Sequence, residues 1–441
     1  MTSRGTVVAA GQEIPGYARS PLPSEYLVRL RREEVDKQSL DKAALGLAAP
    51  LMAIGAFFTG YQALRIGPIN LTLSDIAFAS AFAICAWRGR LTSRPFGGFT
   101  SVYIAGLTLI LGGLMIGTAV HGDMTRWVVI SSQYLFGYLL LPMMFLNQPR
   151  WLAHRIVICF LVGMALLEAS GIVASLTMDH ARASRYLSQE FISGNGRVSS
   201  FAAEPNWNGQ LISMAFPLLI YCYAKRLISL LLFITIAVLL AWGLLLCASF
   251  AGFIAAVITV SITLLFAGIR RIAAALVIIA VAGSIYVASG APMPAAFEKR
   301  VAGAISEADL DSAGTYAGRV KLIRLAWETS EDTMLLGLGV EGFRKTNDIQ
   351  QPVHNLFLLL LVDGGFMSLL GLCVLVGTLV WTPLPFLAQN RLGVGTALAL
   401  IAAFLIYTQS NPHMFSRLNI NPVMFSLLLL YVGDGRVTRK F

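Results

Sequence analysis

Long apolar runs separated by short polar stretches cover most of this chain from Ala43 onwards. Twelve of the runs approach the roughly 20 residues that a helix needs to cross the core of a bilayer. They are residues 43–64, 71–87, 99–119, 127–146, 156–176, 207–223, 227–246, 252–268, 272–289, 354–380, 393–408 and 419–432. The pattern predicts an all-α polytopic membrane protein with about 12 transmembrane helices.

One long polar stretch interrupts this pattern. The apolar runs, the polar stretch and the two polar ends together predict five regions. They are a cytoplasmic tail (1–42), spans one to nine (43–290), a long loop with short helices (291–353), spans ten to twelve (354–433) and a second cytoplasmic tail (434–441). A transport path or a structural bundle has little need of such a loop. Chemistry at a membrane surface does need one, so we expect the functional residues there.

The composition agrees with a membrane protein, because 56% of the residues are hydrophobic and only 13% are charged, against about 25% in soluble domains. The net charge of +10 resides mainly in short loops between spans, where it sets orientation and contacts lipid headgroups, so no nucleic-acid partner is expected.

The five cysteines lie in or at the ends of apolar runs without close pairing, which indicates neither a disulfide framework nor a metal site. The first span is long enough to remain uncleaved.

The basic residues also predict the orientation, because positively charged short loops stay in the cytoplasm. With both termini inside, 20 of the 33 Lys and Arg residues are cytoplasmic, and seven of the others lie in the long loop. Residues 177–206 and 291–351 then share the outer face. That side has no supply of ATP or nucleotide sugars, so a transferred group must arrive already activated, and a lipid-linked donor fits best.

The first outer loop ends in a polar run, residues 197–206, just before a span. Pro205 and Asn206 suit the first turn of a helix, and Pro205 biases Glu204 toward extended backbone. One interpretation is a capped helix entry with solvated Arg197 and Glu204. The other is that Arg197 reaches an anionic headgroup.

A helix-like stretch, residues 315–329, lies in the long loop. Helical spacing places Arg319 beside Leu322 and Ala326, away from Arg324 and Glu328, so it lacks a local partner. Arg319 is either an ordinary snorkelling residue or a planar fork of donors aimed at a diphosphate. The glycine-rich residues 337–343 that follow do not succeed a strand, so we interpret them as a turn that returns the loop to the membrane.

His354 opens the tenth predicted span. A histidine at this position is either an interfacial hydrogen-bonding residue or a base that takes a proton from an attacking hydroxyl, with Asn355 orienting it. No two of the five histidines have metal-ligand spacing, so no metal and no cofactor is expected.

Glu168 and Asp363 lie within predicted spans, where an ionisable side chain is by default a functional candidate. They support an alternative of another class, a proton-coupled secondary transporter. The sequence shows neither an inverted repeat nor a matched pair of broken helices, which such transporters use.

The arrangement resembles the Wzy-type polysaccharide polymerases and O-antigen ligases of bacterial envelopes, which are membrane glycosyltransferases of the GT-C kind. The resemblance covers about residues 197–372 and rests on four segments in order. These are RVSSFAAEPNWNGQ after the fifth span, AGRVKLIRLAW and LLGLGVEGF in the long loop, and VHNLFLLLLVDGG at the tenth span.

The resemblance implies roles for particular residues: Arg197 and Arg319 bind the donor diphosphate and His354 activates the acceptor, with Glu204, Asn206 and Asn355 as further substrate-binding candidates. Relatives often carry a Ser-Arg pair at the turn between spans seven and eight, whereas this chain has Ser249 and Phe250 there. The missing arginine's role would then pass to Arg197 or Arg344.

The implied activity is metal-independent, inverting transfer of a glycan from undecaprenyl diphosphate at the outer face of a bacterial inner membrane. The acceptor is another lipid-linked repeat unit in a polymerase, which makes O-antigen, capsule or exopolysaccharide, and the lipid A core in a ligase. Sequence does not separate the two. A chain-length regulator would be a further partner of a polymerase.

The predicted helix of residues 315–329 carries Arg319 and Lys321 on different sides, so variants of the two residues can be compared. Arg319→Ala should abolish polymer in cells while the protein remains folded and inserted, because one lost charge-stabilising donor costs about 10²- to 10³-fold in rate. Lys321→Ala, on another side of the same helix, should be tolerated. Equal damage from both, measured as polysaccharide on gels, would contradict the assignment of faces.

Overall fold

The computed structural model describes residues 41, 43–66, 71–269, 284, 286, 288–290, 292–306 and 316–432. The chain divides into two compact units, Met1–Gly46 and Leu47–Phe441, and every element named below belongs to the second. Within the described ranges the structure is helical, apart from a short antiparallel hairpin of β1 (Arg65–Ile66) and β2 (Leu71–Thr72) and one isolated bridge, Ile192 to Val198.

The long helices follow the predicted spans closely. They are α2 (Ala48–Phe57), α3 (Leu73–Trp87), α4 (Thr100–His121), α5 (Met124–Leu135), α6 (Leu141–Phe145), α7 (Arg150–Thr177), α9 (Pro205–Ala224), α10 (Leu230–Cys247), α11 (Phe250–Ala267), α17 (Leu356–Trp381), α18 (Arg391–Thr408) and α19 (Arg417–Val432). A π-helical turn, η3 (Phe136–Leu140), makes α5 and α6 continuous. Eleven of the twelve predicted spans therefore coincide with described helices, while the ninth, 272–289, lies largely outside the described residues.

Seven helical stretches of the described chain are long and apolar enough to cross a membrane. They are Gly97–His121, Met124–Phe145, Arg150–Thr177, Leu230–Cys247, Phe250–Ala267, Leu356–Phe386 and Arg391–Thr408. Helix α9 has 20 residues, but its first two turns carry Asn206, Asn208 and Gln210, which lower its hydropathy. The protein is a mainly helical, multi-pass membrane protein, as predicted, whereas the count of twelve spans stays a prediction.

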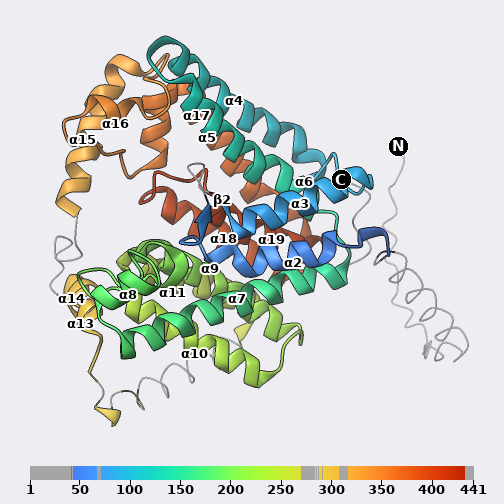
Figure 1. The fold of residues 1–441 in the computed structure, drawn as a ribbon. Helices are drawn as coiled ribbons and strands as arrows, with labels where there is room; N and C mark the ends of the chain where they lie inside the picture. Colours follow the sequence, from blue (N-terminus) through green and yellow to red (C-terminus); the bar gives the residue numbers. More distant parts are fainter. Residues whose placement is uncertain are drawn as a thin grey trace, which may run out of the picture. The chain divides into compact units, whose positions relative to one another are not determined.

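Short elements connect these helices. They are η1 (Phe58–Gly60), η2 (Gly97–Phe99), α8 (His180–Tyr186), η4 (Ser200–Ala202), α13 (Ala295–Phe297), η5 (Glu298–Ala302), α14 (Gly303–Ser306), α15 (Tyr316–Thr333), α16 (Gly342–Thr346) and η6 (Leu384–Phe386). Those in the two loops predicted on the outer face, α8 and α13 to α16, lie at one end of the long helices, on the left in Figure 1. The two loops thus gather at the same end.

Helix α15 packs on α17 through one side only. Leu322 and Ala326 are buried on that side, whereas Ile323 and Trp327 are 39% and 61% exposed. Arg319 is half-buried and Lys321 is exposed. Arg319 therefore lies beside Leu322 and Ala326, as the helical spacing predicted, and this side of the helix proves to be the buried one.

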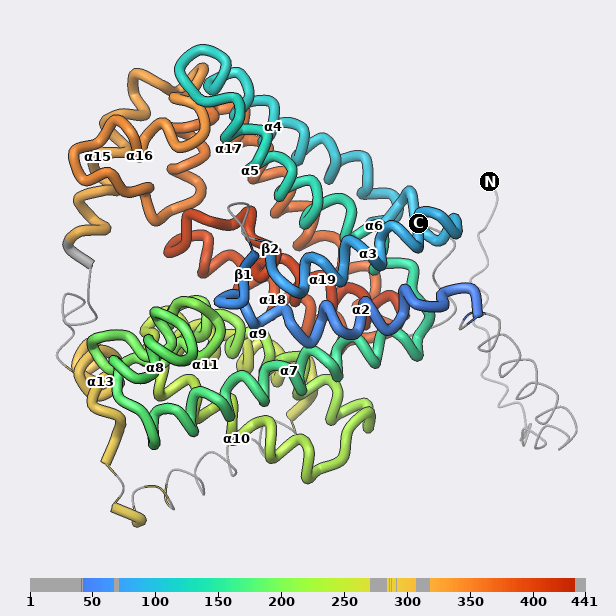
Figure 2. The backbone as a smooth tube through the Cα atoms, viewed as in Figure 1, coloured from blue at the N-terminus to red at the C-terminus, as the bar shows by residue number. Residues whose placement is uncertain are grey.

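Helices α4 and α17 run side by side (Figure 2), and small residues set their separation. A Cβ atom added at Gly113 would lie 2.4 Å from the carbonyl oxygen of Gly364, and one added at Gly371 would lie 2.6 Å from the carbonyl oxygen of Gly106. Small residues stabilise helix pairs in membranes through close approach of this kind, because hydrophobic burial contributes little to helix association there.

The glycine-rich residues 337–343 form a turn held against the ends of α4 and α17, which agrees with the returning turn predicted from the sequence. The amides of Leu338 and Gly339 donate to the carbonyls of Val362 and Asp363, each at 2.8 Å. The Asp363 carboxylate accepts from the Phe343 amide at 2.9 Å. Next to it, α17 is interrupted at Gly365, which has a φ of 67° that favours glycine.

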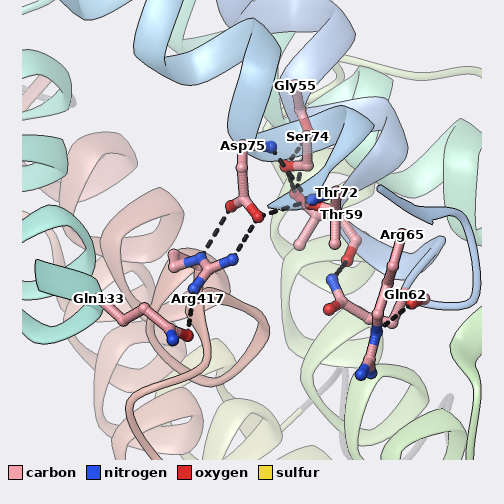
Figure 3. Close-up of polar contacts among 9 residues, drawn as sticks. All are labelled: Gly55, Thr59, Gln62, Arg65, Thr72, Ser74, Asp75, Gln133 and Arg417. Carbon is pink, nitrogen blue, oxygen red and sulfur yellow. Dashed lines mark hydrogen bonds and ion pairs between the residues drawn. The ribbon is translucent and has the colours of Figure 1, made fainter. Parts of the chain in front are cut away.

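A buried ion pair fixes the start of α19 (Figure 3). Arg417 donates from Nε to Asp75 Oδ1 at 2.8 Å and from Nη2 to Asp75 Oδ2, and its Nη1 donates to Gln133 at 2.7 Å. The two side chains of the pair are only 8% and 3% exposed. Thr72 caps α3 and completes a capping box with Asp75. The pair ties α19 to α3 and α5.

Breaking this pair should destabilise the fold strongly. Asp75→Asn leaves a buried guanidinium without its counter-charge, which typically costs about 3–5 kcal/mol, so the thermal unfolding midpoint in detergent should fall. Glu341→Gln, which breaks the more exposed pair of Arg126 and Glu341, is the control and should cost less than about 1 kcal/mol. Similar midpoints for both variants would contradict this role of Asp75.

Candidate active site

A cavity of about 460 Å³ lies where the two loops predicted on the outer face meet. Its wall comes from the start of α9, the start of α11, η5, α15, the approach to α17, and the end of α18 with its connection to α19. The lining residues are Glu204, Asn206, Trp207, Phe250, Ala251, Arg300, Arg319, Gln351, Pro352, His354, Tyr407, Ser410, Asn411, Pro412 and His413.

Four of the six residues proposed from the sequence line this cavity: Glu204, Asn206, Arg319 and His354. They come from segments up to 150 positions apart, so the fold brings them together as the sequence interpretation required. Arg197 lies behind the wall rather than in it, and Asn355 is not among the lining residues.

Arg197 is buried, at 7% exposure, and holds the cavity wall. Its Nε donates to the Cys247 carbonyl at 2.9 Å and its Nη2 donates to Asn206 Oδ1 at 2.7 Å. Asn206 in turn donates from Nδ2 to Glu204 at 2.9 Å. Arg197 therefore orients Asn206 and Glu204 toward the cavity while adding positive charge behind them.

Arg300 and Arg319 each have a hydrogen-bond donor that no described residue engages. Among the described residues, the Nε atom of each is buried without a hydrogen-bond partner. Burial lowers the pKa of both side chains, and Arg319 also lowers that of Arg300 by repulsion. Burial, with Arg300 and Arg319 nearby, lowers the pKa of Arg197 to about 10. Two guanidinium groups thus line one cavity and a third lies behind its wall, while Glu204 is the carboxylate in the lining.

Sequence reasoning missed Arg300, which apolar packing positions. Phe297 and Val301, on either side of it, are buried against Ala248 and Phe250. The rings of Phe253 and Phe297 meet edge to face at 5.8 Å. η5 therefore packs on the turn of Ser249 and Phe250, where the resemblance led us to expect an arginine, and this packing positions Arg300. In the sequence, only the spacing of the apolar residues around Arg300 could have indicated that it is held in place.

Arg344, the other substitute considered from the sequence, lies elsewhere. It lines a neighbouring cavity, where its guanidinium approaches Glu341 at 3.9 Å and its Nε donates to the Gln350 carbonyl. Of the two cavities, the larger one therefore takes its lining arginines from Arg300 and Arg319.

His354 lines the same cavity as Arg300 and Arg319. Its Nδ1 is buried and makes no hydrogen bond to the described residues. Burial, with the charges of Arg319 and His413 nearby, lowers the pKa of His354 to about 4. His413, which sequence reasoning also missed, lines both cavities, and burial lowers its pKa too.

Asn355 and the two acids in the spans have structural partners. Asn355 caps α17 through the Leu358 amide and donates to Gln409 at 2.7 Å, so its amide is engaged away from His354. Glu168 accepts from Asn208 at 3.2 Å, and Asp363 holds the returning turn. Neither acid lines the larger cavity, although Asp363 lines the neighbouring one.

The larger cavity can therefore neutralise an anion and accept a proton. The partly buried guanidinium groups favour a group with several negative oxygens, and the free Nδ1 of His354 can take a proton from a hydroxyl held next to that group. In the described part of the chain no three His, Cys, Asp or Glu side chains gather as metal ligands.

The search of curated proteins found no match. The family model described as O-antigen ligase, Wzy_C, matches residues 235–373. Arg300, Arg319 and His354 lie inside the match, whereas Arg197 precedes it. The family comprises membrane enzymes of the O-antigen ligase and polymerase type, which transfer glycans. The chain therefore carries an O-antigen ligase family domain at residues 235–373, as its resemblance to the Wzy-type polymerases and O-antigen ligases predicted.

Proposed function

We propose that this protein polymerises surface polysaccharide by transferring a glycan from undecaprenyl diphosphate to a hydroxyl of a second lipid-linked repeat unit. The observation that carries the proposal is the single cavity in which Arg300 and Arg319, each with an unpartnered Nε, face His354. The match to the O-antigen ligase family supports glycosyl transfer.

The donor diphosphate binds to Arg300 and Arg319, and the charge of Arg197, behind the cavity wall, adds to the positive potential there. Polyprenyl diphosphate is a good leaving group, so the cavity mainly has to neutralise the charge that develops as the bond from the anomeric carbon to the diphosphate oxygen breaks. Planar guanidinium groups match phosphate oxygens in geometry as well as in charge. The Glu204 carboxylate, held by Asn206, lies clear of the anion and binds sugar hydroxyls.

His354 acts on the acceptor side. Its Nδ1 takes the proton as the acceptor hydroxyl forms the new bond to the anomeric carbon, and undecaprenyl diphosphate departs. This single displacement inverts the anomeric centre, as in inverting glycosidases. Because Arg319 is one cause of the low pKa of His354, a bound diphosphate that offsets the Arg319 charge raises that pKa and makes the imidazole a stronger base.

The basic residues of the short loops support a location in the bacterial inner membrane, with both termini cytoplasmic and the cavity facing the periplasm. A lipid-linked donor suits that side because it brings its activation with it. The reaction needs neither a nucleotide nor a metal, since the arginines supply the positive charge.

Variants of the cavity test the proposal in cells. Arg300→Ala, Arg319→Ala and His354→Ala should each reduce polymer by about 10²-fold or more in a deletion strain, at normal protein levels in the membrane. Arg324→Ala, an exposed arginine on the outer side of α15, is the matched control and should restore wild-type polymer. Full polymer from the Arg319 or His354 variant would refute the proposed roles.

The pH dependence of kcat/KM tests His354 as the base, because this ratio reports ionisations of the free enzyme. The pKa of His354 is lowered from 6.5 to about 4, so the imidazole accepts protons down to about pH 4 and activity is lost below that. In Arg319→Gln the acid limb should move upward, toward pH 6.5, because a charge that lowers the pKa is gone. An acid limb that stays unmoved in the variant would count against His354.

A ligase is the second candidate, favoured because the matched family is described as O-antigen ligase. It would use the same donor and cavity, with the lipid A core as acceptor. Gel profiles of a deletion strain separate the two functions. Single repeat units on lipid A indicate a lost polymerase, whereas uncapped core with long lipid-linked chains indicates a lost ligase.

A further inference from the structure

The walls of the larger cavity differ in chemistry. The arginine wall comes from the long loop, through Arg300 and Arg319. The connection between α18 and α19 and the start of α9 contribute Glu204 and His413 together with neutral side chains, here called the neutral wall. The neutral wall consists of an indole, amides and hydroxyls, including Trp207, Ser410 and Asn411. A diphosphate accounts for the first wall but leaves the second without a ligand.

Asn411 has an unused donor in this neutral wall. The residue is 5% exposed, and its Oδ1 accepts from the His413 amide at 2.9 Å, which fixes the orientation of the side-chain amide. Its Nδ2 is buried and has no hydrogen-bond partner among the residues that the structure describes. A buried donor in this state is costly unless a ligand satisfies it, and a neutral acceptor such as a sugar hydroxyl would do so.

Trp207 supplies an apolar surface that is held in place. The guanidinium carbon of Arg65 lies 5.1 Å from the centre of the Trp207 ring. Arg65 is itself fixed, because its Nε donates to the Gln62 carbonyl at 2.6 Å and the Gln62 side chain donates to Thr59 at 2.8 Å (Figure 3). A cation packed on an aromatic ring stabilises the ring's position, so the indole presents a fixed face to the cavity.

We propose that Trp207, Asn411 and Ser410 form a sugar-binding subsite, in which a pyranose ring of one reacting glycan stacks on the Trp207 indole and accepts a hydrogen bond from Asn411 Nδ2. The inference rests on the proposed function, because the diphosphate on the arginine wall brings the glycan into the cavity. A pyranose has an apolar face of C–H groups that matches an aromatic ring and a rim of neutral hydroxyls that matches amides.

The sugar can belong to the donor or to the acceptor, and two probes distinguish these sources. The first is the lipid-diphosphate-linked repeat unit extracted from the host's membranes, which reports the donor through its KM. The second is the same oligosaccharide released from its lipid, which lacks the diphosphate and can occupy only the acceptor position. Inorganic pyrophosphate, measured on the same protein in nanodiscs, reports the arginine wall alone.

Trp207→Leu and Asn411→Leu should each weaken one of the two sugar probes by about tenfold, the effect of one lost buried contact, while pyrophosphate binds as in the wild type. Asn411→Leu is similar in size and neutral, so it removes the Nδ2 donor without adding a charge to the anion-binding cavity. Trp207→Phe should retain most of the affinity, because a ring remains. Trp381→Leu, an exposed tryptophan beyond the cavity, is the matched control and should change neither probe.

Unchanged constants for both sugar probes in Trp207→Leu and Asn411→Leu would overturn the subsite, and so would a parallel loss of pyrophosphate binding, which indicates a structural role. If Trp207→Leu fails to fold, Asn411→Leu decides alone. Failure of the proposed function gives a different result, since pyrophosphate would then not bind to the wild type while the Trp207-dependent affinity for the oligosaccharide could persist.

Discussion

Positive charge without matching negative charge is the constraint on which this site depends. Arg300 and Arg319 reach one half-buried cavity, Arg197 lies behind it, and Glu204 is the carboxylate among the lining residues. Guanidinium groups removed from water repel each other and cost free energy unless an anion joins them. The surrounding structure therefore holds these guanidinium groups in an arrangement that suits an anion. A diphosphate between the arginines would relieve the repulsion and, through the same field, strengthen the base.

The scaffold holds this unfavourable arrangement through contacts that lie away from the cavity. Small residues let α4 and α17 pack closely, and Asp363 ties the returning turn to α17, which sets the approach to His354. The Asp75 and Arg417 pair anchors α19, four residues after His413. Phe297 and Val301 seat η5 on the turn before α11. Contacts outside the cavity thus fix the segments that line it, which explains how side chains from distant parts of the chain keep their relative positions.

Much of the fold followed from hydrophobic pattern alone, because a bilayer leaves helices as nearly the only spanning structure. The helical period also placed Arg319 beside Leu322 and Ala326, since that argument needs only local geometry, but it did not show that this side of α15 is the buried one. Residues whose role depends on tertiary packing were out of reach. Arg300 lies in an ordinary basic run and becomes notable only through Phe297 and Val301, while Arg197 looked exposed in sequence yet is buried behind Asn206. Asn355 proved to be a helix cap.

The class of enzyme was predictable from the sequence, whereas the chemistry of the site stays a proposal. Arginines in loops predicted on the outer face and a histidine at the start of a span suggested anion binding and proton transfer, and the match to residues 235–373 agrees with an enzyme of the O-antigen ligase and polymerase type. The neutral wall was not anticipated, because Trp207, Ser410 and Asn411 belong to segments more than 200 positions apart. Only the packing of α9 against α18 and α19 brings them to one cavity.

The central claim is that these arginines form a diphosphate site. Its most direct test is the affinity of the purified protein, in nanodiscs, for inorganic pyrophosphate compared with inorganic phosphate. The account predicts tighter binding of pyrophosphate in the wild type and a loss of that preference in an Arg300→Gln, Arg319→Gln double variant that remains folded. Equal affinities for the two anions in the wild type, or an undiminished preference in the double variant, would contradict it.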